Sequence, residues 1–240
     1  MVNFEKNKQF HRKYALTAGI ALIIMALAAS FSNGYVQGKL VVPNDATVTF
    51  NNIISSTALF NAGIFGWLLI FICDVVVAWA LYIFLQPINK NISLLGALLR
   101  LSYTAVLGVA ILNLVFVSLL SSSTDYLFLF GEQQLQTLIL LLLEAFHFIW
   151  SIGLIIFGGH LIIVGYLAFH SKQIPKIISI LLMIASLGYI AIHLFITFLP
   201  YFDVMIKTLK VIFTVPMILG ELGFGLWLLL QGGKYPIKKG

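Results

Sequence analysis

Charge is scarce in this sequence. Asp, Glu, Lys and Arg make up only 9% of its 240 residues, against about 25% in an ordinary soluble domain. Hydrophobic residues make up 61%, and a soluble fold of this length has no interior large enough to bury that much apolar surface. The scarcity of charge therefore excludes a soluble globular protein and indicates that lipid surrounds most of the chain.

Cysteine and the common enzyme signatures are also nearly absent. Cys73 is the only cysteine, so no internal disulfide can form and the redox compartment cannot be read from the sequence. The chain contains no His-Glu-x-x-His, no Gly-x-Ser-x-Gly and no phosphate-binding glycine loop. These absences do not exclude an enzyme, but the sequence identifies no type of reaction that one would catalyse.

Long apolar runs fill most of the chain, and they are continuous, not alternating, which favours helices over a β-barrel. We predict an all-α, polytopic membrane protein in which residues 1–240 form a single membrane domain of six transmembrane helices. Asp45 is a suitable N-cap for a further short helix that lies in the membrane interface. We expect loops at residues 33–44 and 200–207. The transmembrane helices are expected at about 14–31, 57–85, 92–120, 132–170, 176–198 and 209–231, and the interfacial helix at about 45–55.

The fourth run is too long for a simple span. Its 39 residues would extend roughly 58 Å as a helix, whereas the hydrocarbon core is roughly 30 Å thick. Either its polar beginning at Gln133-Gln134 projects into water, or the helix tilts and bends near Gly158-Gly159.

The formal net charge of +6 is explained by membrane orientation and does not indicate nucleic-acid binding. With six spans and the N-terminus inside, ten Lys or Arg residues fall on the inner side and three on the outer side, as the positive-inside rule requires. We predict a multi-pass protein of the cell membrane, such as a bacterial inner membrane, with both termini cytoplasmic. The first apolar run resembles a secretory signal ending at Ala26-Leu27-Ala28, but its length favours a retained helix.

Four ionisable residues lie deep inside the apolar runs. Counting at 1.5 Å per residue from the inner helix ends places Asp74 roughly 17 Å deep, His160 and Glu221 roughly 15 Å, and Arg100 roughly 12 Å. A charge at such a depth costs about 2.5–3.5 kcal/mol on insertion scales and normally faces the bundle interior. We therefore predict one polar cluster that is built from Asp74, Arg100, His160 and Glu221 near the bilayer midplane.

The charges of this cluster do not cancel. Arg100 can neutralise only one of the two carboxylates, so the other must be protonated, pair with a protonated His160 or bind a ligand cation. This imbalance favours a site that binds a small ligand, a cation or protons. The alternative is a structural network that only fixes helix packing.

A second polar group is predicted nearer the outer face, from Glu144, His147 and His193. Three nitrogen and oxygen ligands could hold zinc with one open position, although one Glu-x-x-His arm is only part of a di-iron arrangement. Haem fits less well, because His147 and His160 point about 140° apart around a straight helix. We expect no cofactor, and the metal site is kept as an alternative.

Several short motifs follow one another along the chain: Val42-Pro43, Cys73-Asp74-Val75, Leu99-Arg100-Leu101, Phe157-Gly158-Gly159-His160-Leu161, Gly165-Tyr166-Leu167, Pro175, Gly188-Tyr189, Gly220-Glu221 and Leu226-Trp227-Leu228-Leu229. Taken in order, they resemble a bacterial and archaeal family of six-helix membrane proteins, domain of unknown function 4386. The resemblance implies a shared six-helix fold with the same intramembrane Asp, Arg, His and Glu positions, and it implies no activity.

The sequence thus supports three hypotheses about function. The first is a binding or transport role for the midplane cluster, in which the partners are the lipid bilayer and a small ligand, a cation or protons. The second is an intramembrane enzyme, metal-dependent through Glu144, His147 and His193, or using His160 with a carboxylate. The third is a structural or regulatory membrane subunit. A filled cavity, a bound metal or a dry ion-paired network would distinguish the three.

Overall fold

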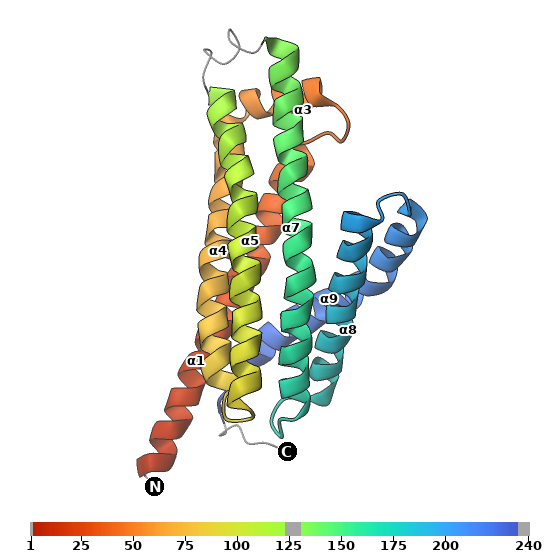
Figure 1. Ribbon diagram of the computed structural model, residues 1–240. Coiled ribbons are helices and arrows are strands. Elements are labelled where there is room, and N and C mark those ends of the chain that lie inside the picture. Colours follow the sequence, from red (N-terminus) through yellow and green to blue (C-terminus); the bar gives the residue numbers. More distant parts are fainter. Residues whose placement is uncertain (1, 123–130, 235–240) are drawn as a thin grey trace. The chain divides into compact units, whose positions relative to one another are not determined.

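The structure is a computed structural model that describes residues 2–122 and 131–234. Its elements in this part of the chain are all helices (Figure 1). In chain order they are α1 (Val2–Ala29), a π-helical segment η1 (Ser30–Gln37), α2 (Gly38–Leu40), α3 (Ala46–Ser55), α4 (Thr57–Leu85), α5 (Lys90–Ser122), α7 (Glu132–Phe169), α8 (Lys176–Phe198) and α9 (Asp203–Leu230).

Six helical stretches within the described residues are long and apolar enough to cross a membrane: His11–Leu40, Thr57–Leu85, Lys90–Ser122, Glu132–Phe169, Lys176–Phe198 and Asp203–Leu230. Large apolar side chains cover their outward faces, and Val211 on α9 is 80% exposed. Exposed apolar faces of this kind are typical of a surface that contacts a membrane or a protein partner. The prediction of an all-α polytopic bundle is confirmed.

The first span is longer than predicted. Its predicted end lies near residue 31, with a loop at 33–44, but the chain stays helical through η1 and α2 to Leu40. Gly34 and Gly38 lie within this helical stretch, because glycine weakens a helix without ending it. A helical backbone also satisfies its own hydrogen-bonding groups, which an apolar medium requires.

The other deviations concern helix ends. The loop predicted at 200–207 is shorter, because α9 already begins at Asp203. The long fourth run is one helix, α7, without a break at Gly158-Gly159. Asp45 caps α3 by accepting a hydrogen bond from the Val48 amide, and the position of α3 in the membrane interface stays a prediction. Two of the ten Lys and Arg residues assigned to the inner side, Lys238 and Lys239, lie outside the described residues.

The chain divides into two compact units. The first consists of Met1–Ile24, Ile72–Ala105 and Ser151–Gly240, and the second of Met25–Phe71 and Val106–Trp150. Helices α8 and α9 lie entirely in the first unit, while α1, α4, α5 and α7 each contribute a part to both.

In the first unit, Arg12 of α1 holds the C-terminal end of α9. Its guanidinium donates hydrogen bonds to the carbonyl oxygens of Leu228 (3.1 Å), Leu229 (2.5 Å) and Gly232 (2.7 Å). The last carbonyl groups of a helix have no partner within the helix, and a cation there also complements the helix dipole. The beginning of α1 and the end of α9 therefore lie at the same end of this unit.

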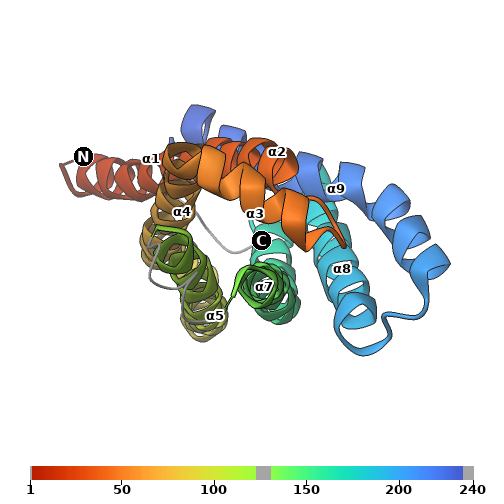
Figure 2. The same cartoon turned by 90° about the horizontal axis from the view of Figure 1, so that it is seen from above.

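Helices α8 and α9 pack side by side as an antiparallel hairpin in the first unit (Figure 1, Figure 2). Gly220 makes the close approach possible, because a Cβ at this position would lie 3.1 Å from the backbone carbonyl of Leu181. The neighbouring residue Glu221 is thereby brought against α8 at mid-helix.

The second unit is held by aromatic and neutral polar contacts. Trp67, which is 1% exposed, packs edge-on against Phe146 and Trp150 with ring centroids 5.0 and 4.8 Å apart. Ser118 donates a hydrogen bond of 2.7 Å to Asn61. The buried residues of this unit include no Asp, Glu, Lys or Arg among those described, so the buried charge of the described chain lies in the first unit.

Candidate functional site

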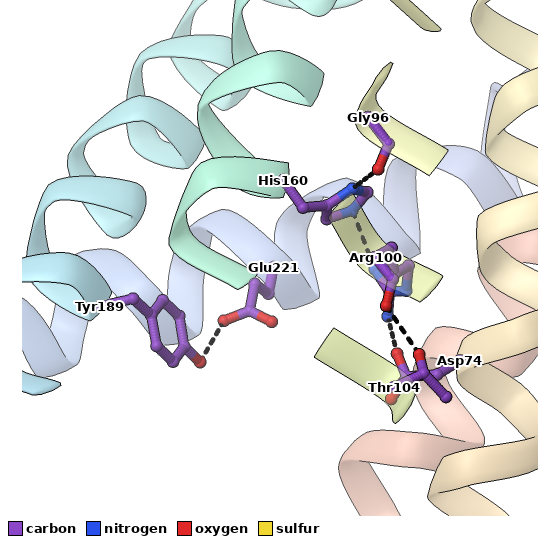
Figure 3. A network of polar contacts seen from close by, with 7 residues as sticks. All are labelled: Asp74, Gly96, Arg100, Thr104, His160, Tyr189 and Glu221. Carbon is purple, nitrogen blue, oxygen red and sulfur yellow. Dashed lines mark hydrogen bonds and ion pairs between the residues drawn. The ribbon is translucent and has the colours of Figure 1, made fainter. Parts of the chain in front are cut away.

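The four predicted midplane residues all lie in the first unit, on four different helices. Asp74 of α4 is 0% exposed, Arg100 of α5 2% and His160 of α7 1%. Glu221 of α9 is partly buried. Figure 3 shows these side chains together with the residues that contact them.

Asp74 and Arg100 form a buried ion pair. Nη2 of Arg100 lies 2.6 Å from Oδ1 of Asp74 (Figure 3). The contact joins two opposite charges at hydrogen-bond distance. Opposite charges that are both removed from solvent depend on each other, because either one left alone would be an uncompensated charge in an apolar interior.

His160 is the second partner of Arg100, and its two ring nitrogens have different roles. Nδ1 lies 2.8 Å from the carbonyl oxygen of Gly96, which can only accept, so Nδ1 carries the proton. Nε2 lies 3.1 Å from Nη1 of Arg100, which can only donate, so Nε2 is the acceptor. These contacts assign a neutral imidazole. His160 is therefore a fixed support for Arg100 and supplies no positive charge to a carboxylate.

Arg100 has further contacts that hold it in place. Its guanidinium carbon lies 5.4 Å from the ring centroid of Phe157, within the range of a cation–π interaction. Its carbonyl oxygen accepts a hydrogen bond of 2.8 Å from the Thr104 hydroxyl (Figure 3). The arginine side chain is thus fixed between α4, α5 and α7.

Glu221 is bound differently from Asp74. The hydroxyl of Tyr189 on α8 donates a hydrogen bond of 2.6 Å to Oε1 of Glu221, and Figure 3 shows the carboxylate turned toward this hydroxyl. Within the part of the chain that the structure describes, the ion pair found for Arg100 is with Asp74. The second carboxylate thus has a neutral partner.

A small cavity separates Glu221 from the Arg100 group. Arg100, His160 and Glu221 form its polar wall, and Leu81, Leu182 and Phe224 are among its apolar residues. The space open to the centre of a water molecule is about 10 Å³, which is about the room that one water molecule occupies. A single water could therefore lie beside the Glu221 carboxylate.

His193, predicted as a metal ligand, belongs to a separate hydrogen-bonded group in the first unit. Its Nδ1 lies 2.7 Å from the hydroxyl of Ser151 on α7. Thr197, one turn later on α8, donates a 3.3 Å hydrogen bond to the same hydroxyl. Ser151 and Thr197 are buried, and His193 is partly exposed.

The other two predicted metal ligands, Glu144 and His147, are exposed on α7 in the second unit. Over residues 2–122 and 131–234, no group of three or more His, Cys, Asp or Glu side chains is placed to hold a metal ion. Because His193 already bonds with Ser151, the structure gives no support to Glu144, His147 and His193 as a ligand set.

The sequence analysis missed three side chains of these groups: Tyr189, Ser151 and Thr197. Tyr189, His193 and Thr197 recur every four residues in a mostly apolar helix, which places them on one face. That spacing was the available signal. Ser151 gives no such signal, because a lone serine in a transmembrane helix is common and usually bonds within its own helix.

Comparisons with known proteins agree with the resemblance that the motifs indicated. The family described as "Domain of unknown function (DUF4386)" matches residues 17–232. An uncharacterised protein of Archaeoglobus fulgidus is 34% identical over 171 residues, which cover 71% of this chain and 84% of that protein. No solved structure matches the chain.

Proposed function

We propose that this chain, which belongs to the family described as Domain of unknown function (DUF4386), is a proton-linked membrane protein whose exchanging group is the carboxyl of Glu221. The observation that carries the proposal is the difference between the partners of Arg100 and the partner of Glu221. Its guanidinium is paired with Asp74 at 2.6 Å and hydrogen-bonded with His160 at 3.1 Å, while Glu221 contacts the neutral hydroxyl of Tyr189.

The charges of the cluster support a labile proton. Asp74 and Arg100 cancel each other, and the contacts of His160 assign it as neutral. Arg100 attracts an ionised Glu221 electrostatically, but the ion pair found for Arg100 in the described chain is with Asp74, and His160 adds no positive charge. A carboxylate in apolar surroundings without a cation is unfavourable unless it takes up a proton or binds a positive ligand.

The size and lining of the cavity favour a proton over the other ligands. An organic ligand needs a pocket of about 300–1,000 Å³, whereas the space beside Glu221 holds about one water. A metal cation needs several oxygen ligands, and here it would meet the guanidinium of Arg100 on the same wall. A proton carried by one water fits the volume of the cavity and needs no set of several oxygen ligands.

Proton flux into vesicles tests the proposal. Purified protein in liposomes that contain a pH-sensitive dye is given a membrane potential, and we expect wild-type protein to conduct protons. Glu221→Gln keeps the size and hydrogen-bonding capacity of the side chain but cannot ionise, so it should abolish the flux. Glu144→Gln, an exposed acid in the second unit, is the matched control. Wild-type flux no greater than that of empty vesicles, or equal flux in Glu221→Gln, would refute the proposal.

We also propose that both termini face the cytoplasm. The contacts of Arg12 with the end of α9 support termini on one side, and the excess of ten Lys and Arg over three supports that side as the cytoplasmic one. In a Cys73→Ala background, a membrane-impermeant thiol reagent should modify a cysteine at Lys39 and spare one at Lys234. The opposite pattern would reverse the orientation.

A further inference from the structure

A row of polar side chains leads from Glu221 along α8 toward the end of that helix at Phe198. Tyr189, His193 and Thr197 occupy one face of α8 at intervals of four residues, and Ser151 of α7 bonds with two of them. We propose that these four side chains, the α8 relay, conduct protons between Glu221 and the membrane surface at the end of α8. This inference rests on the proposed function of Glu221.

The hydrogen bonds of the α8 relay all point in one direction. Thr197 donates to the Ser151 oxygen at 3.3 Å, which leaves the Ser151 proton free to point at Nδ1 of His193, 2.7 Å away. His193 then carries its own proton on Nε2. At the other end, Tyr189 donates to Glu221 at 2.6 Å. Donors thus succeed each other from the helix end toward Glu221, which is the order that a proton relay requires.

His193 and Tyr189 are adjacent without a direct hydrogen bond. Their rings stack with centroids 6.1 Å apart and planes inclined by 14°. The proposed relay requires one bridging water between Nε2 of His193 and the Tyr189 oxygen. His193 is partly exposed near the end of α8 at Phe198, and Lys210 of α9 is a charged group that acts on it electrostatically.

The proton balance of one transfer is simple. Surface water gives a proton to the Thr197 oxygen as the Thr197 proton passes to Ser151 and the Ser151 proton passes to Nδ1 of His193. The imidazolium releases its Nε2 proton through the bridging water to the Tyr189 oxygen, and the Tyr189 proton passes to the Glu221 carboxylate. The result is one neutral Glu221 carboxyl and one hydroxide at the surface, while every relay group is again neutral.

The pair Ser151–His193 could also suggest a nucleophile with its base. Hydrolysis, however, needs hydrogen-bond donors directed at the oxyanion, and unengaged backbone N–H groups beside the nucleophile are a common source of them. Ser151 lies in the interior of α7, where backbone N–H groups bond within the helix. The position of Ser151 therefore favours proton conduction over nucleophilic catalysis.

The rate at which Glu221 gains its proton tests the α8 relay. Wild-type protein in lipid nanodiscs is subjected to a rapid drop in pH, and the carbonyl infrared band of the Glu221 carboxyl is followed in time. Ser151→Ala removes the central hydroxyl, and it should slow the appearance of the band by about a hundredfold, the lower end of what a positioned proton-transfer group contributes. Thr197→Val and Tyr189→Phe should also slow it.

Ser186→Ala is the matched control. Ser186 is a buried hydroxyl on the same helix, but it donates to the Gly158 carbonyl at 2.7 Å and lies outside the α8 relay. Equal rates in Ser151→Ala, Ser186→Ala and wild type would overturn the relay and leave the role of Glu221 intact. A wild-type protein without any titrating Glu221 band would overturn the proposed function and the relay together.

Discussion

Asp74 and Glu221 are two carboxylates in the same unit whose partners differ in charge. The partner of Asp74 is a cation, and that of Glu221 is a neutral hydroxyl. Asp74 is fully buried and paired with Arg100 at 2.6 Å. Glu221 borders a water-sized cavity and accepts a hydrogen bond from Tyr189. The first acid has a fixed cation, so its ionised state is part of the packing. The second has a neutral donor, so its charge can change without breaking an ion pair.

The largest expected effect comes from separating the first pair. Arg100→Leu leaves Asp74 as a buried charge without a cation and removes the partner of His160 Nε2. The free energy of unfolding should fall by about 3–5 kcal/mol, measured by denaturant unfolding in detergent micelles.

The double variant Arg100→Leu/Asp74→Asn is the control for this loss. Removing both charges should restore part of the stability, because no uncompensated charge stays buried. If Arg100→Leu alone unfolds like the wild type, the Asp74–Arg100 pair has no structural role and the contrast with Glu221 fails.

A smaller effect is expected at the contact that brings Glu221 to α8. Gly220→Ala introduces a Cβ 3.1 Å from the Leu181 carbonyl, so the hairpin must open. Overpacking of this kind costs about 1–3 kcal/mol. The control is Gly223→Ala on the same helix, where a Cβ meets nothing within 4 Å, and this variant should not lose stability. Equal stability of both variants would show that close α8–α9 packing is not needed.

The smallest change in stability is expected for Tyr189→Phe. It removes one hydrogen bond to Glu221 and should lower the free energy of unfolding by about 1 kcal/mol. Tyr166→Phe, an exposed tyrosine on α7, should leave it unchanged. A loss as large as that of Arg100→Leu would mean that Tyr189 compensates a permanent charge on Glu221, which contradicts an exchanging carboxyl.

The fold follows from the sequence because lipid imposes simple rules. Six apolar runs of sufficient length predict six spanning helices, and the described residues contain six helices long and apolar enough to cross a membrane. The errors lie at helix ends, where Gly34 and Gly38 were read as a loop but stay helical. An apolar medium favours a continuous helix even at glycine. A glycine is therefore a weaker sign of a helix end in a membrane protein than in a soluble one.

Only part of the site could be predicted from the sequence. Depth along the helices predicts a cluster of Asp74, Arg100, His160 and Glu221, but the pairing depends on helix rotation, which residue counting does not give. The sequence could not tell whether Asp74 or Glu221 holds Arg100, nor that His160 serves Arg100 as a neutral acceptor. Tyr189 was missed for the same reason, because its importance comes from Gly220, which brings α9 against α8.

The most direct measurement is an equilibrium infrared titration of carboxyl groups in wild-type protein, Glu221→Gln and Asp74→Asn. A protonated carboxyl has a carbonyl stretching band that an ionised one lacks. The expected result is a band that appears reversibly as the pH falls, persists in Asp74→Asn and is missing in Glu221→Gln. A band that is lost in Asp74→Asn and kept in Glu221→Gln would assign the exchanging proton to Asp74 and contradict the proposal.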